Sequence, residues 1–186
     1  MDSRERLIEA TAELLRRDGY SAMSPAAIQR RAGVGQGSMY HHFGGKTELA
    51  AVALQRNADE LLAAARTVLT GPGSPVERVI GYLERERDPL LGCPVGRLAQ
   101  DREVLADDDL HKSVGDTFVT IEGLITAVLA EDRSIAKPAE VAAAVVAVVQ
   151  GGYVLARAAG DRAPFDRAVA GAVHLLNHQA AKGATA

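Results

Sequence analysis

The fold of this chain is decided by a short stretch near its N-terminus, AGVGQGSMYHHF, which covers residues 32–43. The Gly33–Val34–Gly35 segment within it is a turn signal, because glycine tolerates left-handed backbone and commonly ends a helix. Ser24–Pro25 has the order of an N-cap and a first helical residue, so a short helix is expected from there to the turn. A second short helix is expected over residues 36–42. Two short helices joined by a glycine-centred turn predict a helix-turn-helix.

Longer helices are expected on both sides of this motif. Apolar residues that recur with the helical period of 3.6 residues predict a helix over 4–17. A fourth helix is expected over 46–69. The core of this N-terminal part is assigned to Ile28, Val34, Met39 and Phe43. Proline and glycine residues then predict where further helices begin and end. A helix is expected over 75–88, followed by a bend at 89–96 and a short helix that ends near residue 105. Three longer helices are expected, one that starts at 107–109 and ends at 129, one over 138–159 and one over 164–179. The chain is therefore expected to be all-α, with about nine helices, a three-helix head and a larger helical-bundle body.

The composition agrees with packed helices in a reducing compartment. Hydrophobic residues make up 47% of the chain, whereas aromatic residues make up only 4% and tryptophan is absent. A single cysteine excludes an internal disulfide. The longest apolar run, residues 141–149, is shorter than the ~20 residues of a membrane-spanning helix. With no leader pattern at the start, we expect a soluble, cytoplasmic protein without a membrane partner.

Charge is distributed unevenly along the chain. Residues 1–56 hold eight Lys or Arg against six Asp or Glu, a net charge of +2, and the remainder holds 13 against 18, a net charge of −5. A basic head on an acidic body is typical of modular DNA-binding proteins, although many enzymes show a similar imbalance.

The second short helix carries groups suited to reading DNA bases. Gly35, Gly37 and Ser38 are small enough to let the backbone approach a groove closely. Gln36 carries a planar amide that can bind the edge of an adenine.

Other side chains around the turn are suited to binding phosphate. Tyr40 and His42 are donors for phosphate oxygens, although Tyr40 could instead cap the core. Lys46 is a cation in the first turn of a helix, where its charge interacts unfavourably with the helix dipole. An anion beside it, such as a DNA phosphate, would offset this cost. Ser24 could hold a phosphate in the same way. His41 could touch a base or simply be exposed.

The same stretch resembles the recognition-helix motif of the TetR family of bacterial regulators. The resemblance extends over roughly the first 60 residues, with Gly19–Tyr20, Ile28 and Lys46 at the family's positions. It implies a DNA-binding domain over 1–50, a ligand-binding and dimerisation domain over 51–181, and a frayed tail over 182–186. It further implies a homodimeric repressor that binds palindromic operator DNA and is released by a small-molecule inducer.

Four positions depart from the family pattern. Met23 replaces the usual threonine, Gln29 replaces a small alanine where the two short helices cross, and Gly44–Gly45 replaces the frequent Pro-Ser before Lys46. The spacing of the two short helices is therefore expected to differ slightly, and the cap of the fourth helix is expected to be weaker.

The body resembles the LmrA/YxaF-like branch of the family, through GCPVG at 92–96, QGGY at 150–153 and ARA at 156–158. In the family the last two helices form a four-helix dimer interface. A helix as apolar as residues 141–155 must be covered on more than one side, and small residues would permit close approach: Ala144, Ala147, Gly151 and Gly152. The alternative is a helix buried wholly within one subunit.

An inducer pocket is expected between the long helices of the body. Phe118, Glu122 and Tyr153 place aromatic or polar chemistry among aliphatic residues, so they are the candidate lining groups, with plain core or surface roles as the alternative. Cys93 is interpreted as a bend residue rather than a redox sensor, because there is no resolving cysteine.

The main rival functions are an enzyme and a helical adaptor or small-molecule-binding protein without specific DNA binding. His174 and His178 have the spacing of a metal pair, but Leu175 stands where the zinc-protease pattern needs glutamate and no third ligand is evident. The sequence contains no nucleophile-elbow, P-loop or dinucleotide-binding motif. We therefore expect no catalytic residue, no metal and no cofactor.

Overall fold

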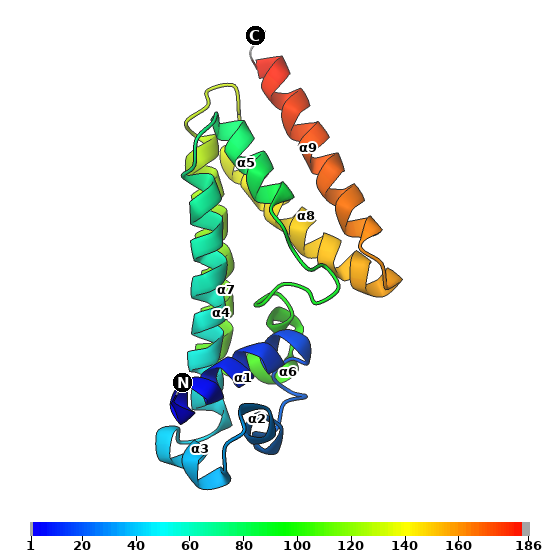
Figure 1. The fold of residues 1–186 in the computed structure, drawn as a ribbon. Helices are drawn as coiled ribbons and strands as arrows, with labels where there is room; N and C mark the ends of the chain where they lie inside the picture. The colour runs from blue at the N-terminus through cyan, green and yellow to red at the C-terminus, as the bar shows by residue number, and fades with distance from the viewer. Residues whose placement is uncertain (1, 184–186) are drawn as a thin grey trace. The chain divides into compact units, whose positions relative to one another are not determined.

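The computed structural model describes residues 2–183, which form nine α-helices and one short 3-10 helix, with no β-strand in that range (Figure 1). The all-α prediction is confirmed. The helices are α1 (Ser3–Arg17), α2 (Pro25–Ala32), α3 (Gln36–His42), α4 (Lys46–Leu69), α5 (Pro75–Glu84), η1 (Leu98–Gln100), α6 (Arg102–Leu105), α7 (Asp108–Leu129), α8 (Pro138–Ala159) and α9 (Ala163–Gly183).

The chain divides into two compact units, and both are discontinuous in sequence. The first comprises the residues up to Leu61 together with Cys93–Thr117, and the second comprises Leu62–Gly92 together with the residues from Phe118 on. The division falls inside α4 and inside α7. The functional boundary near residue 50 stays a prediction. Of the tail expected over 182–186, residues 182 and 183 belong to α9, and 184–186 lie outside the described residues.

The helix ends of the first unit follow from local capping. The Asp2 side chain accepts a hydrogen bond from the Glu5 N–H at the start of α1, and Ser24 accepts one from the Ala27 N–H at the start of α2. The turn between α2 and α3 depends on Gly33, which has φ +63° and lies in the left-handed region. Figure 1 shows α1, α2 and α3 gathered closely, as a three-helix head requires.

The core of the head lies where the sequence predicts it, with one exception. Ile28 and Met39 are 0% exposed and Phe43 is also buried, whereas Val34 is only half-buried. Gln29 lies where α2 and α3 meet, and its Nε2 donates to the Met39 sulfur at 3.5 Å. The long side chain at this position is thus accommodated between the two helices.

α5 is shorter than expected, because it ends at Glu84 rather than near Asp88. Pro89 disfavours helical backbone only at Asp88, the residue before it. The Arg87 guanidinium folds back and donates to the carbonyl oxygens of Leu83 at 2.7 Å and Tyr82 at 2.6 Å, which satisfies acceptors that a longer helix would have used.

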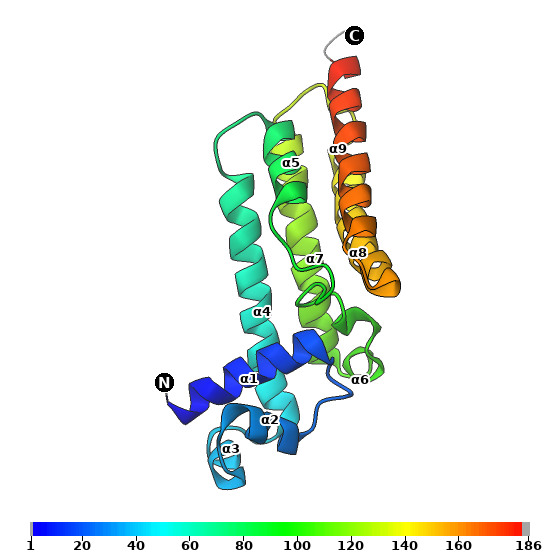
Figure 2. The ribbon, with the colours of Figure 1, turned by 45° about the vertical axis from the view of Figure 1, so that its right-hand side comes forward.

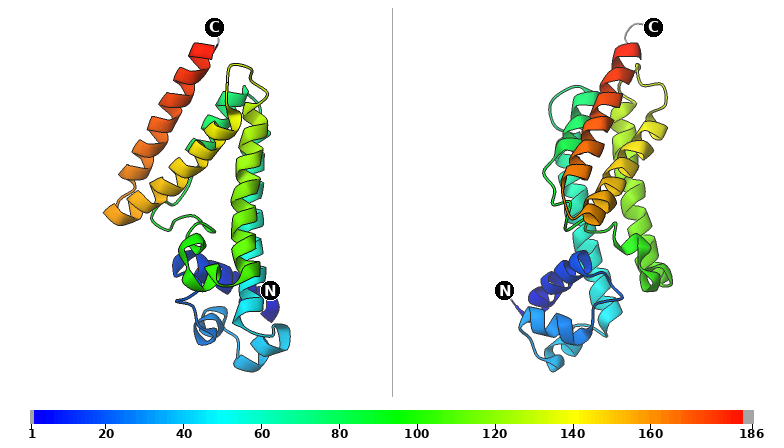
Figure 3. Two further views of the ribbon diagram at one scale, coloured as in Figure 1. Left: turned by 180° about the vertical axis from the view of Figure 1, so that it is seen from behind. Right: turned by 90° about the vertical axis from the view of Figure 1, so that its right-hand side faces the viewer.

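The second unit is organised by α8 and α9, which lie side by side and run in opposite directions (Figures 2 and 3). Phe165 of α9 fills the space above Gly152 of α8, where an added Cβ would lie 2.8 Å from the ring. The Tyr153 ring packs on the same phenylalanine, with ring centroids 5.1 Å apart. Gly152 therefore permits the close approach of α9 to α8 within the chain.

The opposite face of α8 is exposed and apolar after Glu140 of the first turn. Its apolar members recur at helical spacing and are Ala143, Ala144, Ala147, Gly151, Val154, Leu155 and Ala158, which we call the apolar strip. By length and composition alone α8 could span a membrane, and 33% of its most apolar window is buried. A single such helix is weak support for a membrane protein, because helices that pack in soluble proteins have the same composition.

The contact between Gly152 and Phe165 predicts a clear effect on stability. We expect Gly152→Ala to lower the free energy of unfolding by about 1–3 kcal/mol, because the new methyl group overlaps a buried ring. Gly123→Ala on α7 is the control, since nothing lies within 4 Å of its added Cβ. The control should raise stability by about 0.5–1 kcal/mol through helix propensity. Urea unfolding measures both, and equal stabilities of the two variants would contradict the packing described.

Candidate nucleic-acid interface

α3 presents one exposed face opposite its buried side. Gln36, Gly37, Tyr40 and His41 are exposed at positions i, i+1, i+4 and i+5, whereas Met39 is buried between them. Gly35 is the N-cap of α3, also exposed, and Ser38 is half-buried. The glycines have nothing within 4 Å of an added Cβ, so the start of this helix is open to a groove. The exposed face carries amide, phenol and imidazole groups, all of which form hydrogen bonds with nucleic acid.

Tyr40 and His42 differ in their contacts with other residues of the chain. Tyr40 is 50% exposed, which does not fit the alternative that it caps the core. The His42 Nε2 shares a hydrogen bond of 2.9 Å with the Ser3 hydroxyl, and its ring meets His41 edge-on at 4.9 Å. This contact joins the end of α3 to the start of α1 and leaves Tyr40 and His41 as the freer groups.

Lys46, the first residue of α4, already has an anion beside it. Its Nζ lies 3.5 Å from the Glu103 carboxylate and 3.9 Å from the centre of the Tyr20 ring, and its side chain is 20% exposed. We expected a DNA phosphate to offset the unfavourable helix dipole at this position. Glu103 of α6 supplies negative charge there within the protein itself.

Asp101 fastens the loop between α1 and α2 to the start of α6. One carboxylate oxygen accepts from the Ser21 N–H at 2.8 Å, the other accepts from the Ser21 hydroxyl, and it also caps Glu103 N. Burial raises the pKa of Asp101, but these hydrogen bonds outweigh it, so the net shift is downward. Arg97 adds a bond of 2.8 Å to the Arg17 carbonyl. No local sequence pattern points to this clamp, because its partners lie 80 residues apart.

Two ion pairs hold α1 against its neighbours. Arg31 of α2 binds Glu13 of α1 through two nitrogens, at 2.8 and 2.6 Å. Arg56 of α4 binds Glu5 of α1 at 2.5 and 3.0 Å, and this hydrogen bonding is the main reason that the pKa of Glu5 is lowered. Paired planar groups of this kind fix orientation more strongly than single contacts.

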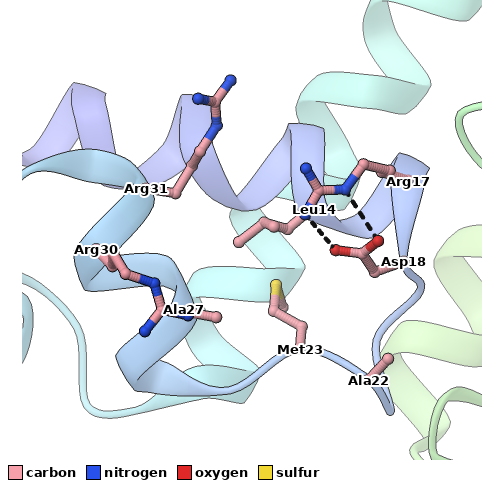
Figure 4. Close-up of a pocket in the computed structure, with 8 residues that line it drawn as sticks. All are labelled: Leu14, Arg17, Asp18, Ala22, Met23, Ala27, Arg30 and Arg31. Atoms are coloured by element: carbon pink, nitrogen blue, oxygen red, sulfur yellow. Dashed lines mark hydrogen bonds and ion pairs between the residues drawn. The ribbon is translucent and has the colours of Figure 1, made fainter.

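A hollow of about 400 Å³ opens on the head between α1 and α2 (Figure 4). Its apolar floor includes Leu14 and Met23, and three arginines line it. Arg17 pairs with Asp18, and Arg31 pairs with Glu13 as described above. Arg30 is exposed and forms no ion pair within the described residues, so its positive charge is available to a partner. The sequence analysis did not single it out.

The candidate groups for ligand binding lie in two places in the second unit. Phe118 and Glu122 are half-buried and one turn apart on α7. Tyr153 is 7% exposed and belongs to the cluster with Phe165. Cys93, in the first unit, is a buried free thiol, which fits a packing role. His174 and His178 are exposed on α9, and residues 2–183 contain no group of three His, Cys, Asp or Glu side chains placed to hold a metal ion.

Two family models match separate parts of this chain. Residues 7–53, which include the helix-turn-helix, match the model for bacterial regulatory proteins of the tetR family. Residues 76–170 match the model for the C-terminal domain of LmrA/YxaF-like transcriptional regulators. The chain belongs to the TetR family, in its LmrA/YxaF-like branch. It is a helix-turn-helix transcriptional regulator, and the resemblance noted in the sequence is confirmed.

Similar proteins support this assignment over most of the chain. The transcriptional regulator LmrA of Bacillus subtilis is 25% identical over 172 residues, which are 88% of this chain and 91% of LmrA. The repressor KstR of Mycolicibacterium smegmatis is 32% identical over 95 residues, and the match spans only 48% of this chain and 47% of KstR. A TetR-family regulator from Agrobacterium tumefaciens has the same fold, with a TM-score of 0.81 and 25% identity over 92% of this chain and 96% of that one.

The Asp101 clamp predicts a pH-dependent loss of stability. We expect Asp101→Asn to lower the free energy of unfolding by about 1 kcal/mol at neutral pH, because an amide accepts hydrogen bonds less well than a carboxylate. Since the folded pKa of Asp101 is lowered, its contribution is complete above the ordinary aspartate value of about 3.9 and is lost as pH falls through the folded value.

Denaturant unfolding of both proteins between pH 3 and pH 7 measures this difference. The gap between wild type and variant should be constant above about pH 5 and should shrink below about pH 4. Asp109→Asn, an exposed position in the first turn of α7, is the matched control. A gap that stays the same down to pH 3 would show that the Asp101 carboxylate is not what holds the loop.

Proposed function

We propose that this protein is a cytoplasmic repressor that binds a palindromic operator as a homodimer and is released by a small-molecule inducer. The observation that carries the proposal is the exposed face of α3, which offers Gln36 and Tyr40 from a helix-turn-helix of a known regulator family. Two copies would place two such helices in successive major grooves, with half-sites about 34–36 Å apart.

Within each half-site the contacts divide into two kinds. Gln36 is the candidate for reading an adenine edge, with Gly35, Gly37 and Ser38 permitting close approach. Tyr40 and His42 are candidates for positioning contacts on phosphates, and His41 for a contact with a base. Ser24 is a further candidate for phosphate, because its hydroxyl oxygen accepts from Ala27 N while its proton is still free to be donated. Arg30 adds a cation without an internal partner. Lys46 must exchange Glu103 for a phosphate in order to take part.

The dimer is proposed to form through α8 and α9. The apolar strip offers mostly alanine and glycine, which allow two helices to approach closely, and Leu175 of α9 is also exposed, at 68%. Exposed apolar surface of this extent is typical of a subunit interface. A second copy seated here explains why so apolar a helix is covered on only one side within a single chain.

Ligand response is proposed to act through the body. Phe118, Glu122 and Tyr153 are the candidate contacts for the inducer. One segment of the second unit ends at Gly92, and the chain then continues into the first unit. This continuation contains three residues that bind the head: Arg97, Asp101 and Glu103. An inducer shifts the equilibrium between DNA-binding and released forms only by its difference in affinity for the two.

Selection from a random duplex library at fixed salt tests the proposal directly. Enrichment of one palindrome, lost with Gln36→Ala and weakened with Tyr40→Phe, supports sequence-specific repression by α3. Both variants change exposed side chains, so circular dichroism should show an unaltered fold. Weak, salt-labile binding without a consensus would favour a helical small-molecule-binding or adaptor protein instead.

The contact between Lys46 and Glu103 makes a separate prediction. If a phosphate takes the place of Glu103, Glu103→Gln should tighten operator binding by several-fold, because the competing carboxylate is removed. The salt dependence should stay the same or become steeper. Fluorescence anisotropy with the selected duplex measures both quantities. Weaker binding by the variant would mean that the pair serves only to hold α4 against α6.

The apolar strip predicts a monomer on substitution. Leu155→Asp places a charge in the proposed interface, where burying it without a partner costs several kcal/mol, so we expect dissociation at micromolar concentration. Val119→Asp is the control, since Val119 is 71% exposed on α7, outside the strip. Sedimentation velocity should find a dimer for wild type and the control and a monomer for Leu155→Asp. A monomeric wild type would refute the interface.

A further inference from the structure

Arg87 is a buried cation without a carboxylate partner. Its side chain is 8% exposed, and among residues 2–183 no Asp or Glu forms an ion pair with it. Buried charges in proteins are normally paired or bound to an ion, because removing them from water is costly. The regulator's activity on DNA, which belongs to α3, makes no use of this group.

The hydrogen bonds of Arg87 account for only part of its capacity. Nη1 donates to the carbonyl oxygens of Leu83 at 2.7 Å and Arg85 at 2.9 Å, and Nη2 donates to that of Tyr82 at 2.6 Å. The guanidinium has five N–H groups, and the buried Nε has no acceptor. Capping the end of α5 is therefore one role of Arg87, and it leaves an N–H unused.

The surroundings of Arg87 hold a second cation and three aromatic rings. The guanidinium carbon lies 5.1 Å from the centre of the Tyr82 ring and 6.0 Å from that of Phe165. Arg85 approaches the same Tyr82 ring at 5.7 Å, and its Nε also lacks an acceptor. Burial first, and then the nearby Arg85, lowers the pKa of Arg87, while Tyr153 and Tyr82 partly oppose this.

Arg78, in the same unit, is an arginine whose charge is neutralised by a carboxylate. Its Nε likewise has no acceptor, but its Nη2 binds the Glu131 carboxylate and its Nη1 donates to the Leu69 carbonyl at 3.1 Å. Within the described residues, Arg87 has backbone carbonyls and the Tyr82 side chain as partners, but no carboxylate. Positive charge is thus left uncompensated where α5 ends and where Tyr153 of α8 meets Phe165 of α9.

We propose that Arg87 binds the acidic group of the inducer, and that the inducer is therefore an organic monoanion with a flat aromatic body. A carboxylate can accept from Nε and Nη2 of one guanidinium together, which is the geometry that arginine favours. The rings of Tyr82, Tyr153 and Phe165 suit a flat apolar body. The acid would take over donors that now cap α5, so the loop over 85–92 must shift when it binds. This inference rests on the proposed function, because it names the ligand class of the proposed inducer site.

The test compares 2-naphthoate with 2-naphthamide, which share a ring system and differ in charge. Isothermal titration calorimetry of the full-length protein without DNA should show saturable binding of the carboxylate and at least tenfold weaker binding of the amide. The Arg87→Lys variant, which keeps the charge but loses the planar fork, should lower affinity for the carboxylate at least tenfold. Arg162→Gln should have no effect, since Arg162 is exposed and pairs with Asp166 on α9.

A readout in the wild-type protein guards against a variant that fails to fold. The side-chain Nε–H signals of arginine in a nitrogen-15 spectrum should include one that moves with 2-naphthoate and stays in place with 2-naphthamide. Equal binding of the two compounds, or undiminished binding of the carboxylate to Arg87→Lys, would overturn the inference, as would the absence of binding to either compound.

Operator binding, measured separately, distinguishes this inference from the proposed function. A protein that selects a palindrome but binds no naphthoate is a regulator without this anion site, and the inference fails alone. A protein that binds naphthoate through Arg87 while its operator affinity is unchanged has the anion site, and release by a ligand at that site fails. Loss of sequence-specific DNA binding altogether would leave the calorimetry and the arginine spectrum as a test of the site by itself.

Discussion

The left-handed backbone at Gly33 is the constraint on which the DNA-binding head depends. With φ +63° and ψ 38°, it lets the chain leave α2 and enter α3 within three residues. A residue with a Cβ would pay about 1–2 kcal/mol for the same turn. The angle that results buries Ile28 and Met39 against each other's helices and turns Gln36 and Tyr40 outward. Exposed polar groups and core groups can therefore alternate along a helix of only seven residues.

Several charged side chains in the head form ion pairs that position its helices. Cations without such a partner are the ones most readily available to DNA. Arg31 and Arg56 are committed to Glu13 and Glu5, and Lys46 is shared with Glu103. Arg30 has no such commitment among the described residues. A count of basic residues thus overstates the charge that the head can offer to phosphates, because only unpaired or exchangeable cations release counterions on binding.

Local chemistry allowed most helix boundaries to be predicted from sequence. The Ser24–Pro25 start and the Gly33 end of α2 involve neighbouring residues, and so does the Pro138 start of α8. The end of α5 was missed because it depends on a side chain folding back from Arg87. The neighbour of Gly152 could not be predicted either, because small residues occur on both sides of α8 and only the position of Phe165 distinguishes them.

The candidate site divides in the same way. The exposed face of α3 follows from helical spacing around Met39, so sequence alone could propose Gln36 and Tyr40. The partners of Lys46 and Ser21 could not be proposed, since Glu103 and Asp101 are 57 and 80 residues away. Single sequences carry no signal for such long-range pairs. Phe118, Glu122 and Tyr153 were chosen by chemistry alone, which does not say which of them share a cluster.

As the proposed dimer interface, the apolar strip on α8 would also bear on how a cell keeps related regulators apart. A surface built mostly from alanine and glycine depends more on close fit than on the amount of apolar area buried, since small side chains bury little area each. Any paralogue whose matching helix carries one bulky residue at the crossing point would be held off by sterics. After a gene duplication, one substitution of this kind by a bulkier residue would leave each copy able to form homodimers but not heterodimers. Neither copy of α3 would need to change.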